Sequence, residues 1–383
     1  MNLRVYIQGI GMLVGMIFGA GVFALPASIA KAGIWWGSIH FFLAFFVVLF
    51  LHLLYGEIIF YIPGKHRITG YVEMLLGSRA KFIAFLFTLF SYYGTLLVYA
   101  ILGGIFLFNA FSFFTPFVWS TIFLILGAFF SGFNFQKIGS INFYLSIPLF
   151  VLIIVLAFLA APHIKADNFL NLDFFATPFW FLPYGVFIFS LGGFSVVPEV
   201  KDILEGHSLR DFKKIIKISS VIIAVSYLIF ILSIIGVSGA ATSDEAFAGV
   251  TAVLGGTVIK IGLIIGLLAF FTSFIALTSD LKSIFQFDYK ISYGISWIFT
   301  ILPVPILFFL ISKDFISIIA MIGAIGLGIF GVFVLFMAKE MKKRLSERNI
   351  NTGLLFLPSF IVYFIIFALF AASVYEAAKI LFF

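Results

Sequence analysis

Two segments place glycines at the centre of long apolar stretches, and their backbone groups are the first candidates for chemistry. One segment covers residues 15–26 (GMIFGAGVFALP) and the other covers residues 189–199 (FSLGGFSVVPE). In each, a glycine (Gly21 or Gly193) lies five residues before a proline. Glycine costs about 1 kcal/mol and proline about 3 kcal/mol in a helix interior, and proline also removes a backbone donor. Both segments are therefore predicted to interrupt a helix.

An interrupted helix exposes backbone groups that bind charge. The free N–H groups of a half-helix attract a carboxylate, and free carbonyls attract an ammonium group or a metal cation. An α-amino acid carries both charges on one carbon and fits such a pair without any buried ionised side chain. Freed backbone groups cannot face lipid, so they must line a cavity. The alternative is that the glycines only allow close helix packing, but two clusters at matched positions favour the binding interpretation.

Ionisable side chains are scarce at the centres of the apolar stretches. Three acids lie near the ends of these stretches: Glu57, Glu199 and Asp280. Three basic residues share the predicted cytoplasmic side with them: Arg67, Lys201 and Lys282. We predict that some of these groups form a salt-bridged inner gate. The alternative is that single charges reach individually to the membrane interface.

The remaining polar residues offer no catalytic set. His40 and His52 are twelve residues apart, which places them on different helix faces, and we interpret them as packing or interfacial residues. The chain has no cysteine and no local cluster of His, Asp and Glu. An enzyme within a membrane needs such a cluster, so the sequence predicts no enzymatic activity and no cofactor apart from a coupling ion.

The composition places these segments in a lipid bilayer. Of the 383 residues, 63% are hydrophobic and only 10% are charged, with a mean hydropathy of +1.24, whereas soluble domains have about a quarter charged residues. No polar stretch is long enough to fold separately, so residues 1–383 are predicted to form one all-α membrane domain. Spans of about 20 apolar residues number eleven: 6–31, 33–61, 81–111, 115–134, 138–161, 177–200, 214–237, 255–280, 290–311, 315–338 and 353–380.

The charge distribution predicts the topology. With the N-terminus in the cytoplasm, 18 of the 23 Lys and Arg residues fall on the cytoplasmic side and five on the other, as the positive-inside rule requires. The net charge of +7 therefore reports topology and gives no reason to expect nucleic acid as a partner. The C-terminus is then outside a plasma (inner) membrane. Residues 62–80 are expected along the cytoplasmic surface, and residues 238–254 as an external lid or re-entrant loop.

The two interrupted spans are the first and the sixth. This spacing is expected if spans 1–5 (about 6–161) and spans 6–10 (about 177–338) are inverted repeats, with an extra helix at about 353–380. Matched interrupted helices in two halves indicate a transporter binding site near the midplane.

Several motifs in this order resemble the amino acid/polyamine/organocation transporter superfamily. They are residues 18–26 (FGAGVFALP), 190–192 (SLG), 197–200 (VPEV), 272–274 (TSF) with Asp280, and 302–305 (LPVP) followed by 313–315 (KDF). The chain looks most similar to the amino acid/auxin permease and aromatic amino acid permease branches. The resemblance implies a LeuT-type fold of five plus five helices that moves amino acids by alternating access with a coupling ion.

The resemblance also implies roles for particular residues. Backbone N–H groups at Gly19, Ala20 and Gly21 would hold the substrate carboxylate. Oxygens of Phe189, Ser190 and Gly192 would receive the amine, and Phe194 would cover the side chain or act as a gate. Tyr92, Tyr93 and Tyr99 are candidates for the pocket wall. Some aromatic permeases have a polar His at the helix 6 break, where this chain is apolar, so aromatic specificity is left open.

The coupling ion is expected to be sodium. Ala269, Thr272 and Ser273 share one helix face, and their spacing resembles the helix 8 part of a sodium site whose other ligands are backbone carbonyls, here those of Gly15 and Phe18. Sodium is a hard cation and prefers such oxygen ligands. The alternative is that the two hydroxyls only bond back to the preceding turn and that protons drive transport. Some proton-coupled members use a lysine on helix 5, where this chain has only Lys137 at the cytoplasmic edge.

The sequence thus predicts a secondary amino acid transporter, embedded in lipid and coupled to a cation. An exchanger or a transporter of other amines stays open as an alternative. A channel would need a ring of charges, and a sensor would usually carry a soluble output domain; neither is visible in the sequence. The oligomeric state is not predicted.

Overall fold

Every regular element of the part of the chain that the structure describes is a helix. The computed structural model describes residues 3–133, 138–170, 178–204, 206–311, 314–350 and 353–382. Lys137, which bears on the predicted choice of ion, lies outside these ranges, as does Lys313 in the ninth-to-tenth helix motif.

The described helices account for the eleven predicted spans. Seven helices or joined helices are long and apolar enough to cross a membrane, the bent pair α1 (Leu3–Ile17) and α2 (Gly21–Ala32) makes an eighth, and shorter apolar helices fill the other three positions. The seven are α3 (Ile34–Phe60), α5 (Ser78–Phe111), α11 (Leu209–Ser238), α13 (Gly256–Ser283), α14 (Tyr293–Ile301) with α15 (Pro303–Leu310), α16 (Phe315–Met321) with α17 (Gly328–Ser346), and α18 (Ser359–Phe382). The shorter ones are α6 (Pro116–Ser131), α7 (Ile138–Ala160) and α9 (Leu182–Leu191).

Both predicted interruptions are present. Helices α1 and α2 meet at an angle of 52° across three residues, and α9 is separated from α10 (Val197–Ile203) by residues 192–196. Pro198 stands in the first turn of α10, where the missing N–H needs no intrahelical partner. Pro198 thus marks where the sixth span restarts, whereas Pro26 lies inside α2, which restarts at Gly21.

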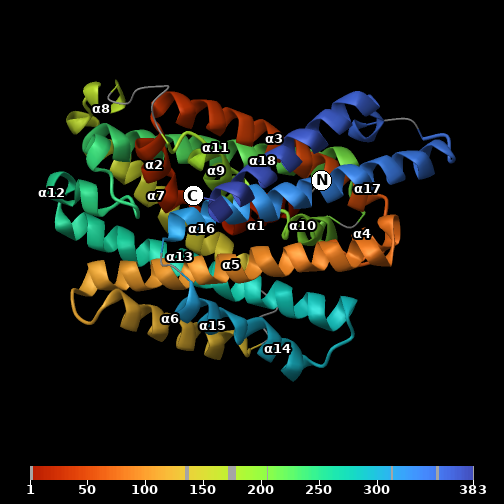
Figure 1. Cartoon of the computed structure of the whole chain (residues 1–383), viewed down its shortest axis with the longest axis horizontal. Coiled ribbons are helices and arrows are strands. Elements are labelled where there is room, and N and C mark those ends of the chain that lie inside the picture. Colours follow the sequence, from red (N-terminus) through yellow and green to blue (C-terminus); the bar gives the residue numbers. More distant parts are fainter. Residues whose placement is uncertain are drawn as a thin grey trace.

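The connecting segments gather at two opposite ends of the molecule. Helix α4 (Ile68–Leu76) lies at one end, and α8 (Asp167–Leu170) and α12 (Thr251–Leu254) lie at the other (Figure 1). The predicted lid folds into the short turns η2 (Gly239–Ala241) and η3 (Ala248–Val250) followed by α12. The N-terminus lies toward the α4 end and the C-terminus toward the α12 end (Figure 1), as an odd number of spans requires.

Helices α9 and α16 to α17 pack with their backbones in contact. The short π-helix η5 (Ile322–Leu327) joins α16 to α17 and lies against α9. A Cβ atom on Gly323 would overlap the carbonyl oxygen of Gly185, so no larger residue fits at either position without moving a helix. Helix α9 contributes to the sixth span, and its position therefore depends on this contact.

We expect Gly323→Ala to lower the stability of the protein, because the added methyl group would collide with the Gly185 backbone. Overpacking of this kind typically costs about 1–3 kcal/mol. Thermal unfolding of the purified variant in detergent measures the effect. Gly294→Ala is the matched control, since a Cβ on Gly294 meets nothing within 4 Å. Equal melting temperatures for the two variants would contradict this view of the contact.

Candidate functional site

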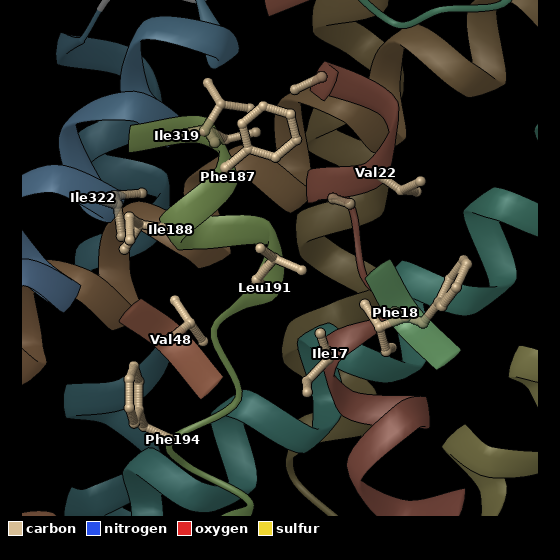
Figure 2. Packing of buried hydrophobic residues seen from close by; sticks show 14 of the residues in the cluster. Ile17, Phe18, Val22, Val48, Phe187, Ile188, Leu191, Phe194, Ile319 and Ile322 are labelled. Atoms are coloured by element: carbon tan, nitrogen blue, oxygen red, sulfur yellow. The ribbon is translucent and has the colours of Figure 1, made fainter. Parts of the chain in front are cut away.

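The two interrupted segments lie against each other at the centre of the molecule. A Cβ atom on Gly21 would overlap the hydroxyl of Ser190, and one on Gly193 would lie 2.5 Å from the Ile17 side chain. Figure 2 shows Ile17 and Phe18 at the first break, Leu191 at the end of α9 where the second break begins, and Phe194 within that break. Glycine at positions 21 and 193 thus permits the close approach of the two unwound segments.

A single tyrosine hydroxyl joins the carbonyl ends of both half-helices. The hydroxyl of Tyr227, on α11, lies 3.0 Å from the carbonyl oxygen of Ile17 and 3.0 Å from that of Ser190. The hydroxyl has one proton for two acceptors. Tyr227 can therefore donate to either carbonyl, and both carbonyl oxygens stay within hydrogen-bonding distance of it. The side chain is fully buried, and sequence analysis did not single it out.

The unwound segments form one wall of a buried cavity of about 120 Å³. Its other walls come from α3, α5, α10, α13 and the η5–α17 region. Most of the predicted substrate-binding residues line it: Gly19, Ala20, Gly21, Phe189, Ser190, Gly192 and Phe194. Figure 2 shows Phe194 on the unwound part of the sixth span.

The cavity wall presents donors and acceptors suited to a zwitterion. The Gly19 N–H donates to the Ile17 carbonyl at 2.8 Å, so the N–H groups for a carboxylate are those at the start of α2, from Ala20 and Gly21 onward. The Ser190 hydroxyl donates to the Val186 carbonyl at 2.7 Å, which leaves its lone pairs as acceptors. Of the three predicted carboxylate-binding N–H groups, that of Gly19 is therefore already paired within the chain.

Tyr93 is not part of the cavity wall. Its hydroxyl donates to the Phe299 carbonyl at 2.6 Å, which holds the side chain toward α14. Tyr92 and Tyr99 line the cavity instead, because they are seven residues apart and share a helix face that Tyr93 does not. The Tyr99 hydroxyl lies about 3.0 Å from the position that a Cβ on Gly19 would take.

His52 is a site residue that sequence analysis interpreted as packing. Its Nε2 atom accepts a hydrogen bond from the Gly193 N–H at 3.0 Å. Its ring packs edge-on against the Phe194 ring, with the two ring centroids 4.4 Å apart. A neutral imidazole that accepts at Nε2 carries its proton on Nδ1. His52 therefore satisfies one of the N–H groups that the second break exposes. His40 does match the packing interpretation, because its ring lies beside those of Trp36 and Trp180.

Of the two predicted hydroxyl ligands on α13, Ser273 is buried in the cavity wall and Thr272 is partly exposed, and both already use their protons. The Thr272 hydroxyl donates to the Ala269 carbonyl at 2.9 Å, and the Ser273 hydroxyl donates to the same oxygen at 3.0 Å. Their lone pairs are left for a cation, so the donor set of hydroxyl and carbonyl oxygens fits sodium. Gly15 and Phe18 are buried near the end of α1, a helix that packs mainly against α7 and α11.

An ion pair closes the α4 end of the cavity. Arg67 Nε lies 2.7 Å from an Asp280 carboxylate oxygen, a guanidinium nitrogen lies 3.6 Å from Glu199, and Tyr92 donates to Asp280 at 2.6 Å. Burial alone would lower the pKa of the Arg67 guanidinium, but the carboxylates of Asp280 and Glu199 raise the pKa above its ordinary value. Arg67 is therefore charged and ties α13 to α10.

Glu57 does not belong to this gate. It faces Lys213 at 2.6 Å and accepts the Leu354 N–H at 2.9 Å, so it connects α3 to α11 and to the segment before α18. The two predicted lysines also bind elsewhere: Lys201 donates to the Ile62 carbonyl at 2.6 Å, and Lys282 donates to the Ser131 carbonyl. Sequence alone grouped these charges by depth in the membrane and did not give their directions.

Five phenylalanines close the α12 end. Each is exposed by at most 1%, and neighbouring ring centroids in this phenylalanine cluster are 4.8 to 6.3 Å apart: Phe23, Phe106, Phe230, Phe247 and Phe270. Phe247 comes from the lid, which the ion pair of Lys31 with Asp244 at 2.8 Å fastens to α2. Arg67 and Asp280 thus stand in the cavity wall at the α4 end, and the phenylalanine cluster lies behind Tyr99, whose ring stacks on that of Phe270 with centroids 6.3 Å apart.

The comparisons with known proteins give the family and the fold of the chain. The sequence model of the tryptophan/tyrosine permease family matches residues 4–374. The crystal structure of MhsT in complex with L-phenylalanine is similar with a TM-score of 0.73 over 96% of this chain and 98% of that chain, at 16% identity. At that identity the likeness shows the fold, which is the LeuT-type transporter fold. No curated protein matches the sequence. The two permease branches that the motifs resemble stay a prediction.

We expect His52→Leu to destabilise the second break, because the buried Gly193 N–H would lose its acceptor. An unsatisfied buried donor costs about 1–3 kcal/mol, which thermal unfolding of the purified protein detects. His52→Gln is the control, since its amide oxygen supplies an acceptor at similar reach. If both variants unfold at the same temperature, the hydrogen bond to Gly193 does not hold the segment.

We expect Asp280→Asn to open the α4 end, because the variant keeps the acceptor for Tyr92 but leaves Arg67 without its nearest counter-charge. Breaking one partner of a buried ion pair costs about 3–5 kcal/mol. The chain has no cysteine, so a single cysteine placed at Ala84, in the cavity wall, reports access to a maleimide that cannot cross membranes. Labelling from the α4 end should accelerate at least about tenfold. Glu340→Gln, which removes an exposed ion pair with Arg344, should leave labelling unchanged, and an unchanged rate in Asp280→Asn would argue against a gate.

Proposed function

Since the chain belongs to the tryptophan/tyrosine permease family, we propose that it carries an aromatic α-amino acid across a membrane by alternating access. The observation that carries the proposal is the cavity between the two unwound segments. Its backbone wall offers N–H groups at the start of α2 and acceptor oxygens at the end of α9, and the two segments that carry these groups lie in contact. These groups match the carboxylate and the ammonium of one amino acid.

The walls of the cavity support an aromatic side chain. Phe189 and Phe194 line it from the sixth span, and Phe330 and Phe333 line it from α17. Aromatic rings prefer to meet other rings edge-on or offset, and the Phe194 ring already packs against Phe330 with centroids 4.4 Å apart. The MhsT structure was solved with L-phenylalanine bound, which is consistent with an aromatic substrate on this fold.

The two closures support alternating access. We propose that the phenylalanine cluster and the Arg67–Asp280 pair open in turn, while the proposed inverted repeats (about 6–161 and 177–338) move against each other. The basic residues near α4 favour that end as the cytoplasmic one, which puts the C-terminus outside the plasma membrane.

We propose sodium as the coupling ion, held by the hydroxyls of Thr272 and Ser273 and by the carbonyls of Gly15, Phe18 and Ala269. A bound cation would supply positive charge between α1 and α13 and would favour the arrangement in which the two helices approach each other. What supports the proposal is the supply of hydroxyl and carbonyl oxygens on one face of α13; the bonds of both hydroxyls to the Ala269 carbonyl are equally expected of the alternative, in which they only bond back to the preceding turn.

We expect L-tryptophan, L-tyrosine or L-phenylalanine to raise the melting temperature of the purified protein, and to raise it further in sodium than in choline. A ligand at 100 times its dissociation constant adds about 2.7 kcal/mol to the native state. Gly21→Ala should lose the shift, since its methyl group would overlap the Ser190 hydroxyl. A folded sample that responds to no amino acid would overturn the proposed function. A shift that ignores sodium would overturn only the choice of ion.

A further inference from the structure

One face of α5 carries a row of hydroxyl groups along the cavity. Thr88, Ser91 and Thr95 all line it, between Ala84 near the α4 end and Tyr99 at the level of Gly19. Their spacing of three and four residues keeps them on one helix face. The row therefore follows the path that leads from the backbone site toward the α4 end.

Each hydroxyl in this row already uses its only proton. Thr88 donates to the Ala84 carbonyl at 2.8 Å, Ser91 donates to the Phe87 carbonyl at 2.8 Å, and Thr95 donates to the Ser91 carbonyl at 2.7 Å. A hydroxyl has one donor and two lone pairs, so what remains toward the cavity is acceptor capacity. A ligand group that meets this face must bring the proton.

Thr95 is the member of the row best placed for a ligand held at the breaks. It lies one helical turn, about 6 Å along the axis, from Tyr99, whose hydroxyl adjoins Gly19. Its side chain is partly exposed, whereas those of Thr88 and Ser91 are buried. The next hydroxyl, Ser91, is reached only because position 326 is glycine, where any side chain would overlap the Ser91 oxygen.

The charged groups of the cavity have other partners and do not compete with the α5 hydroxyls for the side chain of a ligand. Asp280 is occupied by Arg67 and Tyr92, and the ammonium of the ligand is placed at the carbonyl end of α9. The α5 face itself presents no carboxylate or cationic side chain between positions 88 and 99. An uncharged side-chain donor is therefore the group that this wall suits.

We propose that Thr95, extended by Ser91, is a specificity determinant that accepts a hydrogen bond from the substrate side chain. The inference rests on the proposed function and adds to it a preference within the aromatic amino acids. Rings with an N–H or O–H donor, the indole and the phenol, are favoured over the plain phenyl ring. If Thr95 did not supply an acceptor, an indole N–H or a phenol O–H buried against this face would lose its hydrogen bond to water with nothing in return.

The test compares the affinities of L-tryptophan, L-tyrosine and L-phenylalanine in competition for uptake into proteoliposomes. In the unaltered protein, phenylalanine should bind at least about fivefold more weakly than the better of the other two. Thr95→Val keeps the shape of the side chain and removes the acceptor, so it should weaken that preferred substrate by about 5- to 100-fold and leave phenylalanine within about twofold. Thr95→Ser should retain the preference.

The matched control is Thr121→Val on α6, whose hydroxyl makes the same bond to its own helix at 3.0 Å but does not line this cavity. It should leave all three affinities unchanged. Equal losses for all three substrates in Thr95→Val, or no loss for any, would overturn the inference while leaving amino acid transport intact. Failure of the unaltered protein to bind any amino acid would instead overturn the proposed function.

Discussion

The structure depends on the requirement that no backbone polar group be left unpaired in a lipid environment. Two helices that stop at mid-membrane free N–H and carbonyl groups, and neighbouring helices are arranged to meet them. Tyr227 reaches the carbonyls of Ile17 and Ser190, and His52 accepts the N–H of Gly193. The groups that stay free face the cavity, where the proposed zwitterionic substrate would complete the pairing. Substrate binding and the stability of the fold are thus two parts of one hydrogen-bonding problem.

The glycines make this arrangement possible because they bring backbones, and not only side chains, into contact. Gly21 allows the first break to touch Ser190, and Gly323 allows α9 to touch η5. The sixth span is consequently held from both sides, by the first span and by the tenth. At the tenth span the contact is with the Gly185 backbone itself, whereas at the first span it includes the side chains of Ser190 and Ile17.

The sequence predicted the spans and the two breaks because composition and the placement of glycine and proline are local signals. It also identified the part of the cavity wall that the two unwound segments form, but not the hydroxyl groups of α5 or the phenylalanines of α17. It missed Tyr227 and the role of His52 because their partners lie far along the chain. It grouped Glu57 with the predicted gate because the sequence indicates how deep a residue lies in the membrane but not the direction in which its side chain points. It grouped Tyr93 with Tyr92 and Tyr99 for a related reason: one residue rotates a side chain by about 100° around a helix, and the absolute rotation of α5 is set by tertiary packing.

The phenylalanine cluster has a thermodynamic consequence. Separating buried apolar rings and hydrating them increases the heat capacity, so the balance between open and closed states at the α12 end must curve with temperature. Hydrophobic contacts also weaken on cooling, which favours the open form of that end in the cold. The Arg67–Asp280 pair carries little apolar surface and lacks this curvature. If the two ends open in turn as proposed, their open–closed equilibria respond differently to temperature. The side to which the cavity is open then depends on the growth temperature of the host.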